Sequence, residues 1–186
     1  MKIEKLGDKE KLFKCCYGIS SKAGERDEHV FMTDYDGFGI ESVVNQLKQI
    51  QKEFNMSDIY IIESEHGFNA ICLDVMNLSL IYNIGIDVFS FADRDFFRYG
   101  FNRGYFTLRF DKDKKIVRIL KNESHKYIKS LAHKLFLEWY FDIFIDSDYS
   151  FNNYTNIKLV QYPSNKNGYH LFEKQLPQYF EVMKDD

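Results

Sequence analysis

The sequence predicts an α+β fold built on a mostly antiparallel sheet, and two observations carry that prediction. Short apolar runs with strand-like alternation recur along the chain, separated by glycine-containing turns. Two longer stretches, residues 40–54 and 124–145, instead place apolar residues three and four positions apart, as amphipathic helices do. The 186 residues suffice for a single domain, which we divide into a core module at 29–121 and a C-terminal helix and hairpin extension at 122–186.

The first half of the chain alternates strands with one clear helix. Strands are expected at residues 11–20 and 29–36, the second of them ending at two glycines that break the pattern. The helix at 40–54 follows, with an apolar stripe along one side. Strands at 59–64 and 68–74 then form a hairpin around the sequence "EHG".

The second half is predicted to contain, in order, a short helix (76–85), a loop with a helical turn (91–100), two strands forming a hairpin around "DKDK" (104–110 and 114–120), the helix at 124–145, and two final strands (157–162 and 169–173). The core order is therefore strand–helix–strand–strand–helix–strand. This order is typical of ferredoxin-like and RNA-recognition-motif-like domains, with the helices on one face of the sheet.

Composition and charge restrict the function classes. A net charge of −3 and a pI near 6.0 disfavour a protein that coats nucleic acid non-specifically, although a basic groove can coexist with an acidic active site. Three cysteines without disulfide or zinc spacing favour a reducing cytoplasm, and no apolar stretch is long enough to span a membrane. Abundant Lys, Asn, Ile, Tyr and Phe suggest an AT-rich genome, such as that of a virus or mobile element; for a viral protein the cytoplasm would be that of the host.

A first candidate site lies at the end of the strand at 29–36. Asp34 and Asp36 are two positions apart, so an extended backbone directs both carboxylates to the same side. Carboxylates in this arrangement suit a hard divalent cation such as Mg²⁺ or Mn²⁺. Aspartate is also common in turns, and this motif alone leaves both interpretations open.

Two further polar groups follow along the chain. The turn at Gly67 carries His66, and Asn69 lies just beyond it; each could contact a ligand, or His66 could be a solvated turn residue. The segment "DRDFFRYGFNRGYFTLRF" contains Asp93 and Asp95, either of which could supply another carboxylate.

Two arginines in the same segment, Arg103 and Arg109, are candidates to bind a triphosphate, because guanidinium groups match phosphate geometry. The alternative for both is an ordinary position on the surface.

The order of these motifs resembles that of the archaeo-eukaryotic primase (primase-polymerase) superfamily, whose catalytic module has an RNA-recognition-motif-like sheet. The matching positions are Asp34 and Asp36 for its D-x-D, "Ser64-Glu65-His66-Gly67-Phe68-Asn69" for its S-x-x-G-x-H hairpin, Asp95 for its further aspartate, and "Thr107-Leu108-Arg109" for its basic strand. The resemblance covers residues 31–120. It departs from the family pattern at Asn69, where the family has a histidine; His66 lies three residues earlier.

The resemblance implies a small nucleotidyltransferase acting in DNA replication of a virus or mobile element. Asp34, Asp36 and Asp95 would hold two Mg²⁺ or Mn²⁺ ions as the catalytic group. A nucleoside triphosphate would be bound by Ser64, His66, Asn69, Arg103 and Arg109. A DNA template, and a helicase or another replication protein, would be the partners, with bases stacking on exposed aromatic residues such as Tyr35, Phe97 and Tyr99. Packing in the core is the alternative for these aromatic residues.

Three other function classes stay open on the same residues. The chain could be a non-catalytic nucleic-acid-binding replication protein derived from the same fold. It could also be a metal-dependent nuclease that uses the same carboxylates, or an α+β interaction protein.

Overall fold

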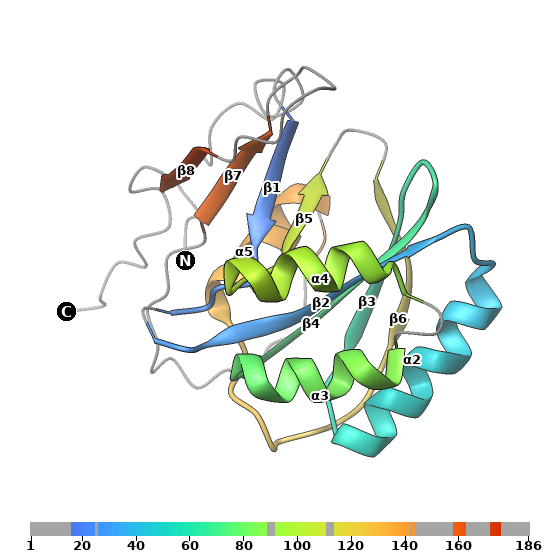
Figure 1. Cartoon of the computed structure of the whole chain (residues 1–186). Helices are drawn as coiled ribbons and strands as arrows, with labels where there is room; N and C mark the ends of the chain where they lie inside the picture. Colours follow the sequence, from blue (N-terminus) through green and yellow to red (C-terminus); the bar gives the residue numbers. More distant parts are fainter. Residues whose placement is uncertain are drawn as a thin grey trace.

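The computed structural model describes residues 16–24, 26–88, 92–110, 114–141, 143, 158–162 and 172–175 (Figure 1). Its elements are, in chain order, β1 (Cys16–Ser20), β2 (His29–Asp36), α2 (Ile40–Phe54), β3 (Ile59–Glu63), β4 (Gly67–Met76), α3 (Leu78–Val88), α4 (Arg94–Arg103), β5 (Thr107–Phe110), β6 (Lys115–Leu120), α5 (Leu131–Phe141), β7 (Lys158–Tyr162) and β8 (Phe172–Gln175). The α+β class is confirmed. No helix among the described residues combines the length and apolarity needed to cross a membrane.

The central sheet has the strand order β2-β4-β3-β6, and all its neighbouring strands are antiparallel. The β2–α2–β3–β4 part follows the predicted order, and β2 and α2 have the predicted bounds. The ferredoxin-like topology is not confirmed, because β6 pairs with β3 at one edge. That topology would place the last strand beside the first.

Helices cover both faces of the central sheet, not the single face that we predicted. Figure 1 shows α2, α3 and α4 in front of the strands and α5 behind them, where α5 contacts β4. The strands β2, β3 and β4 are accordingly buried over almost their whole length, whereas the edge strand β6 is largely exposed; residues 59–62 of β3 and 69–74 of β4 have no exposed position. Near-continuous burial of this kind is what a sheet covered on both faces requires.

A second sheet has the order β5-β1-β7-β8. The predicted hairpin between residues 104–110 and 114–120 is therefore wrong: both strands form, but β5 pairs with β1 and β6 pairs with β3. The predicted pairing of the two C-terminal strands is confirmed, since β7 and β8 are antiparallel neighbours. Residues 11–15 of the first predicted strand, and residues 157 and 169–171 of the two C-terminal strands, lie outside the described residues.

Two helix predictions need correction. The segment predicted as a loop with a helical turn belongs to the ten-residue helix α4, which begins after Asp93 and ends before Gly104. The Asp93 side chain accepts a hydrogen bond from the Asp95 N–H, and Gly104 has a positive φ of 76°, which glycine adopts without strain. The aspartate cap is an ordinary start signal for a helix, and the glycine is an ordinary stop signal.

The second correction concerns the long helix predicted at 124–145, which among the described residues forms only as α5 at Leu131–Phe141; residues 142, 144 and 145 lie outside the described residues. The residues before it run in an extended path beside β4, where the Val75 N–H donates to the Ile128 carbonyl and the Ser130 N–H donates to the Leu73 carbonyl. Ser130 precedes the first helical residue, and its hydroxyl accepts a 3.4 Å hydrogen bond from the His133 N–H. Pairing with β4 therefore replaces the first turns of the predicted helix.

Candidate metal and phosphate site

The end of β2 holds two aspartates on the same side. Tyr35, between them, is fully buried in the core, so Asp34 and Asp36 face away from it toward the surface. The neighbouring strand β4 begins at Gly67, opposite Asp36 in the register. A Cβ at Gly67 would overlap the carbonyl oxygen of Tyr35, so glycine is required for this close approach of the two strands.

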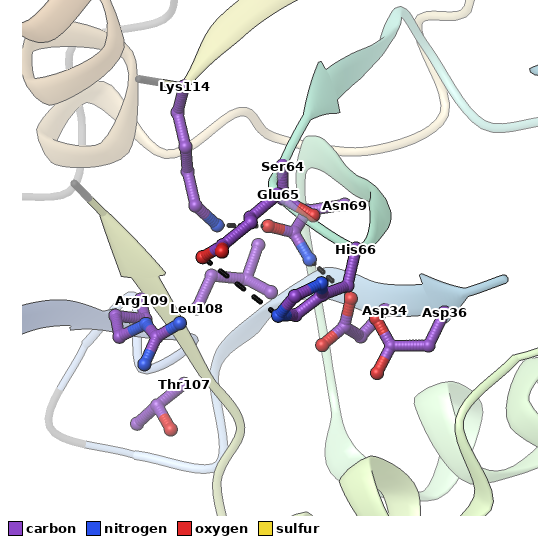
Figure 2. Close-up of a pocket in the computed structure, with 10 residues that line it drawn as sticks. All are labelled: Asp34, Asp36, Ser64, Glu65, His66, Asn69, Thr107, Leu108, Arg109 and Lys114. Atoms are coloured by element: carbon purple, nitrogen blue, oxygen red, sulfur yellow. Dashed lines mark hydrogen bonds and ion pairs between the residues drawn. The ribbon is translucent and has the colours of Figure 1, made fainter. Parts of the chain in front are cut away.

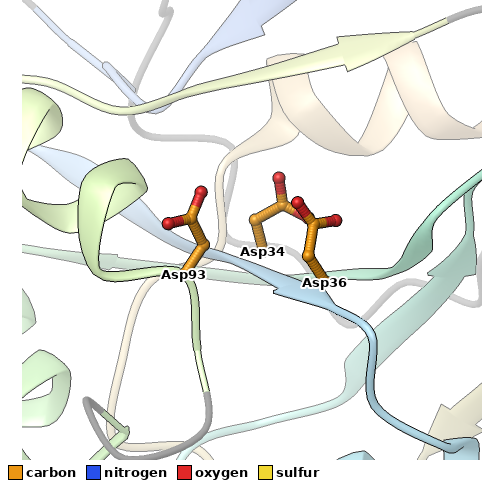
Figure 3. Close-up of side chains that lie close together, drawn as sticks. All are labelled: Asp34, Asp36 and Asp93. Atoms are coloured by element: carbon orange, nitrogen blue, oxygen red, sulfur yellow. The ribbon is translucent and has the colours of Figure 1, made fainter.

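A third carboxylate reaches the same place from α4. Asp93 is the N-cap residue of this helix, and its backbone N–H donates a 2.8 Å hydrogen bond to the carbonyl oxygen of Asp34. This bond fixes the start of the helix against the end of β2. Asp34, Asp36 and Asp93 each offer a carboxylate oxygen, and these three oxygens lie within 4.8 Å of one another (Figure 3).

The three carboxylates, which we call the acidic triad, are electrostatically unfavourable without a counter-ion. Two unit charges 4.8 Å apart repel each other by roughly 3 kcal/mol at an effective dielectric constant near 20. Burial, and then the charges of Asp36 and Asp93, raise the pKa of Asp34 to about 6, whereas the positive charge of Lys114 lowers it. Oxygen ligands at this spacing suit a hard divalent cation such as Mg²⁺ or Mn²⁺.

Asp34 and Asp36 of the triad line a pocket of about 230 Å³. Ten residues line it: Asp34, Asp36, Ser64, Glu65, His66, Asn69, Thr107, Leu108, Arg109 and Lys114 (Figure 2). Figure 2 shows the basic side chains of Arg109 and Lys114 on one side of the pocket and the two aspartates on the other. The Glu65 carboxylate, 3.9 Å from His66, also lines the pocket. We call the side of the two aspartates the acidic end and the side of Arg109 and Lys114 the basic end, an arrangement suited to a cation bound together with an anionic ligand.

The β3–β4 turn supplies one wall of the pocket. Its conformation is set by two backbone hydrogen bonds, from the Ser64 N–H to the Gly67 carbonyl at 2.9 Å and from the Gly37 N–H to the His66 carbonyl at 3.0 Å. The His66 side chain is 72% exposed and lies 3.9 Å from the Glu65 carboxylate. The turn thus brings His66 to the same pocket as Asn69, although the two would face opposite sides of an uninterrupted strand.

Only one of the two predicted arginines lies at the pocket. Arg109, on β5, is exposed and lines the pocket. Arg103 does not line it: its guanidinium donates to the Tyr99 carbonyl at 3.2 Å and to the Thr107 hydroxyl at 3.4 Å, and it lies 5.3 Å from the centre of the Tyr105 ring. The second cation of the pocket is instead Lys114, just before β6.

The structure does not place Asp95, the expected third ligand, with Asp34 and Asp36. It lies outside the acidic triad and forms a 3.1 Å ion pair with Arg98 on the exposed side of α4. Asp93 takes its place, two residues earlier. Side chains two positions apart on a helix do not share a face, so the start of α4 at Arg94 separates Asp93 from Asp95.

Among the aromatic residues expected to stack on bases, only Tyr99 is accessible. Its side chain is 54% exposed, whereas Tyr35 and Phe97 are fully buried and belong to the core. Phe97 packs among other rings, with an edge-to-face contact to Phe106 at 5.5 Å between centroids.

Comparison of the chain with protein-family models, with curated proteins and with solved structures finds no match. The primase resemblance therefore rests on the order and spacing of its motifs.

Proposed function

We propose that this chain is a divalent-metal-dependent nucleotidyltransferase of the primase-polymerase type, which transfers nucleotides from nucleoside triphosphates during DNA replication of a virus or mobile element. The observation that carries the proposal is the acidic triad beside a pocket with two basic side chains. The β2–α2–β3–β4 order agrees with the first part of an RNA-recognition-motif-like catalytic module.

The residues have separate roles in this proposal. Asp34, Asp36 and Asp93 would hold Mg²⁺ or Mn²⁺, which supplies charge neutralisation for the phosphates and activation of the attacking hydroxyl. Arg109 and Lys114 bind the triphosphate from the other side of the pocket. His66, on its exposed turn, donates a hydrogen bond to a phosphate oxygen.

The proposal is tested by template-dependent incorporation of a labelled nucleotide with Mg²⁺ or Mn²⁺. Asp36→Asn and Asp93→Asn should each reduce incorporation by at least about 100-fold, since each removes a charged ligand of the cation. Asp95→Asn is the matched control, because Asp95 lies outside the triad, and it should retain wild-type incorporation. Loss of activity in Asp95→Asn but not in Asp93→Asn would contradict this choice of ligands.

Two other results would replace the proposed function. Cleavage of DNA by the wild-type protein without added nucleotide would identify a metal-dependent nuclease. DNA binding that survives Asp36→Asn and Asp93→Asn, with no incorporation under either metal, would identify a non-catalytic nucleic-acid-binding replication protein. The presence of Asn69 at the position of the family histidine favours this second candidate over the other rivals.

A further inference from the structure

Asn69 connects the two ends of the pocket. It lies on β4 opposite Asp34 of β2 and is only 3% exposed. Its Nδ2 donates a 2.6 Å hydrogen bond to Oδ1 of Asp34, and its Oδ1 accepts a hydrogen bond from the ammonium group of Lys114. Both ends of the amide are therefore engaged within the protein.

The orientation of this amide is dictated by its neighbours. An ammonium group can only donate hydrogen bonds and an ionised carboxylate can only accept them. The amide oxygen must consequently face Lys114 and the amide NH₂ must face Asp34. A flipped amide would set its oxygen against the carboxylate and its NH₂ against the ammonium group. Asp34 and Lys114 therefore select the same orientation, and the hydrogen bond from Lys114 holds the oxygen end of Asn69 in place.

We infer that Asn69 is a positioning residue for the acidic triad, oriented by Lys114, and not a ligand of the nucleotide. The inference rests on the proposed function for the cation and the nucleotide that the pocket receives. By holding one oxygen of Asp34, Asn69 fixes the carboxylate and leaves its second oxygen for the cation. This role differs from the nucleotide contact that the motif alignment implies for this position.

The inference is tested by the affinity of the protein for Mn²⁺ alone, measured from the spin-resonance signal of unbound Mn²⁺ without nucleotide or DNA. Removing a residue that orients a metal ligand typically lowers metal affinity 10- to 100-fold, so Asn69→Leu should weaken Mn²⁺ binding by at least about 10-fold. Asn83→Leu, at an exposed position on α3, is the matched control and should leave it unchanged. Asn69→Ala gives the same readout if the leucine variant does not fold.

A double-mutant cycle distinguishes the hydrogen bond of Lys114 to Asn69 from the direct effect of the Lys114 charge on the cation. Lys114→Met removes a positive charge that repels the cation, which strengthens Mn²⁺ binding, but it also removes the hydrogen bond that holds the Asn69 amide in place, which weakens Mn²⁺ binding. In the Asn69→Leu background only the first effect remains. The improvement caused by Lys114→Met should therefore be larger in that background than in the wild type. Equal effects in both backgrounds would overturn the orienting role.

The outcomes separate this inference from the proposed function. If Asn69→Leu binds Mn²⁺ like the wild type but loses affinity for a fluorescent nucleoside triphosphate, Asn69 is a nucleotide ligand and the inference fails, even where the wild type incorporates nucleotide. If Asn69→Leu weakens Mn²⁺ binding as expected while the wild type incorporates nothing, the positioning role stands and the proposed function fails.

Discussion

Asp34→Asn should make the cation-free protein more stable, and only at pH values where Asp34 is ionised. Burial and the neighbouring Asp36 and Asp93 raise the pKa of Asp34 from 3.8 to about 6. One pKa unit corresponds to about 1.36 kcal/mol, so keeping this carboxylate ionised in the folded protein costs about 3 kcal/mol. An asparagine side chain has no charge to repel, and its oxygen can still accept the hydrogen bond from Asn69.

The sign of the pH dependence follows from the direction of the shift. The folded protein binds the Asp34 proton more tightly than the unfolded chain does, because its pKa is raised. The resulting stabilisation is fully present below pH 3.8 and is lost as the pH rises through about 6. The stability of Asp34→Asn relative to the wild type should therefore increase by up to about 3 kcal/mol between roughly pH 4 and pH 7.5.

The assay is urea unfolding of both proteins in the presence of EDTA across this pH range. Taking the difference between the two proteins cancels the titration of every group that does not interact with Asp34. Asp95→Asn, which removes only an exposed ion pair, should change the free energy of unfolding by less than about 1 kcal/mol at each pH. Adding Mn²⁺ should reduce the difference in unfolding free energy between Asp34→Asn and the wild type, because the cation stabilises the wild type. A difference between Asp34→Asn and wild type that stays constant with pH would refute the electrostatic argument.

Three further predictions concern the core, the turn and the surface. Burial lowers the pKa of His133 from 6.5 to about 4, so the wild type should lose up to about 3 kcal/mol of stability relative to His133→Gln as the pH falls from 6.5 toward 4. Urea unfolding measures this difference, and a difference that does not change with pH would contradict the prediction. Gly67→Ala should lower the free energy of unfolding by more than about 1 kcal/mol and weaken Mn²⁺ binding, because its Cβ would overlap the Tyr35 carbonyl. Calorimetry measures the first effect and Mn²⁺ titration the second. Unchanged values would show that β2 and β4 can move apart to admit the methyl group. Tyr99→Ala should weaken single-stranded DNA binding by about 1–3 kcal/mol in a fluorescence anisotropy titration, whereas Tyr82→Ala, 48% exposed on α3, should not; equal losses would argue against base stacking at Tyr99.

Elements defined by local signals could be predicted from the sequence. The alternation in residues 29–36 and the apolar stripe of residues 40–54 depend on neighbours within a few positions, and both elements have the predicted bounds. The helix α4 had local signals as well, an N-cap aspartate and a glycine after its last residue. Its mixture of charged and aromatic residues shows no clear helical periodicity, so the start of the helix was not predicted. Without that start, the sequence offers no reason to choose Asp93 over Asp95 as the third carboxylate.

Strand pairing and the basic end of the pocket depended on contacts that are distant in the sequence. Nothing local distinguishes a hairpin at residues 104–120 from two strands that join different sheets, because the partner of β5 is β1, some ninety residues earlier. Lys114 belongs to the charged segment "DKDKK", in which any lysine could face the pocket. Only the pairing of β6 with β3 brings Lys114 to Asn69.

The pocket joins side chains of both sheets. The central sheet supplies Asp34, Asp36 and Asn69 from β2 and β4, and Lys114 lies just before its strand β6, whereas Arg109 comes from β5 of the second sheet. The β2 and β5 strands contact each other, so the pocket lies where the sheets meet. A cation and an anionic ligand bound there would each neutralise one side. It follows that binding of both ligands should stabilise the contact between the sheets more than either ligand alone.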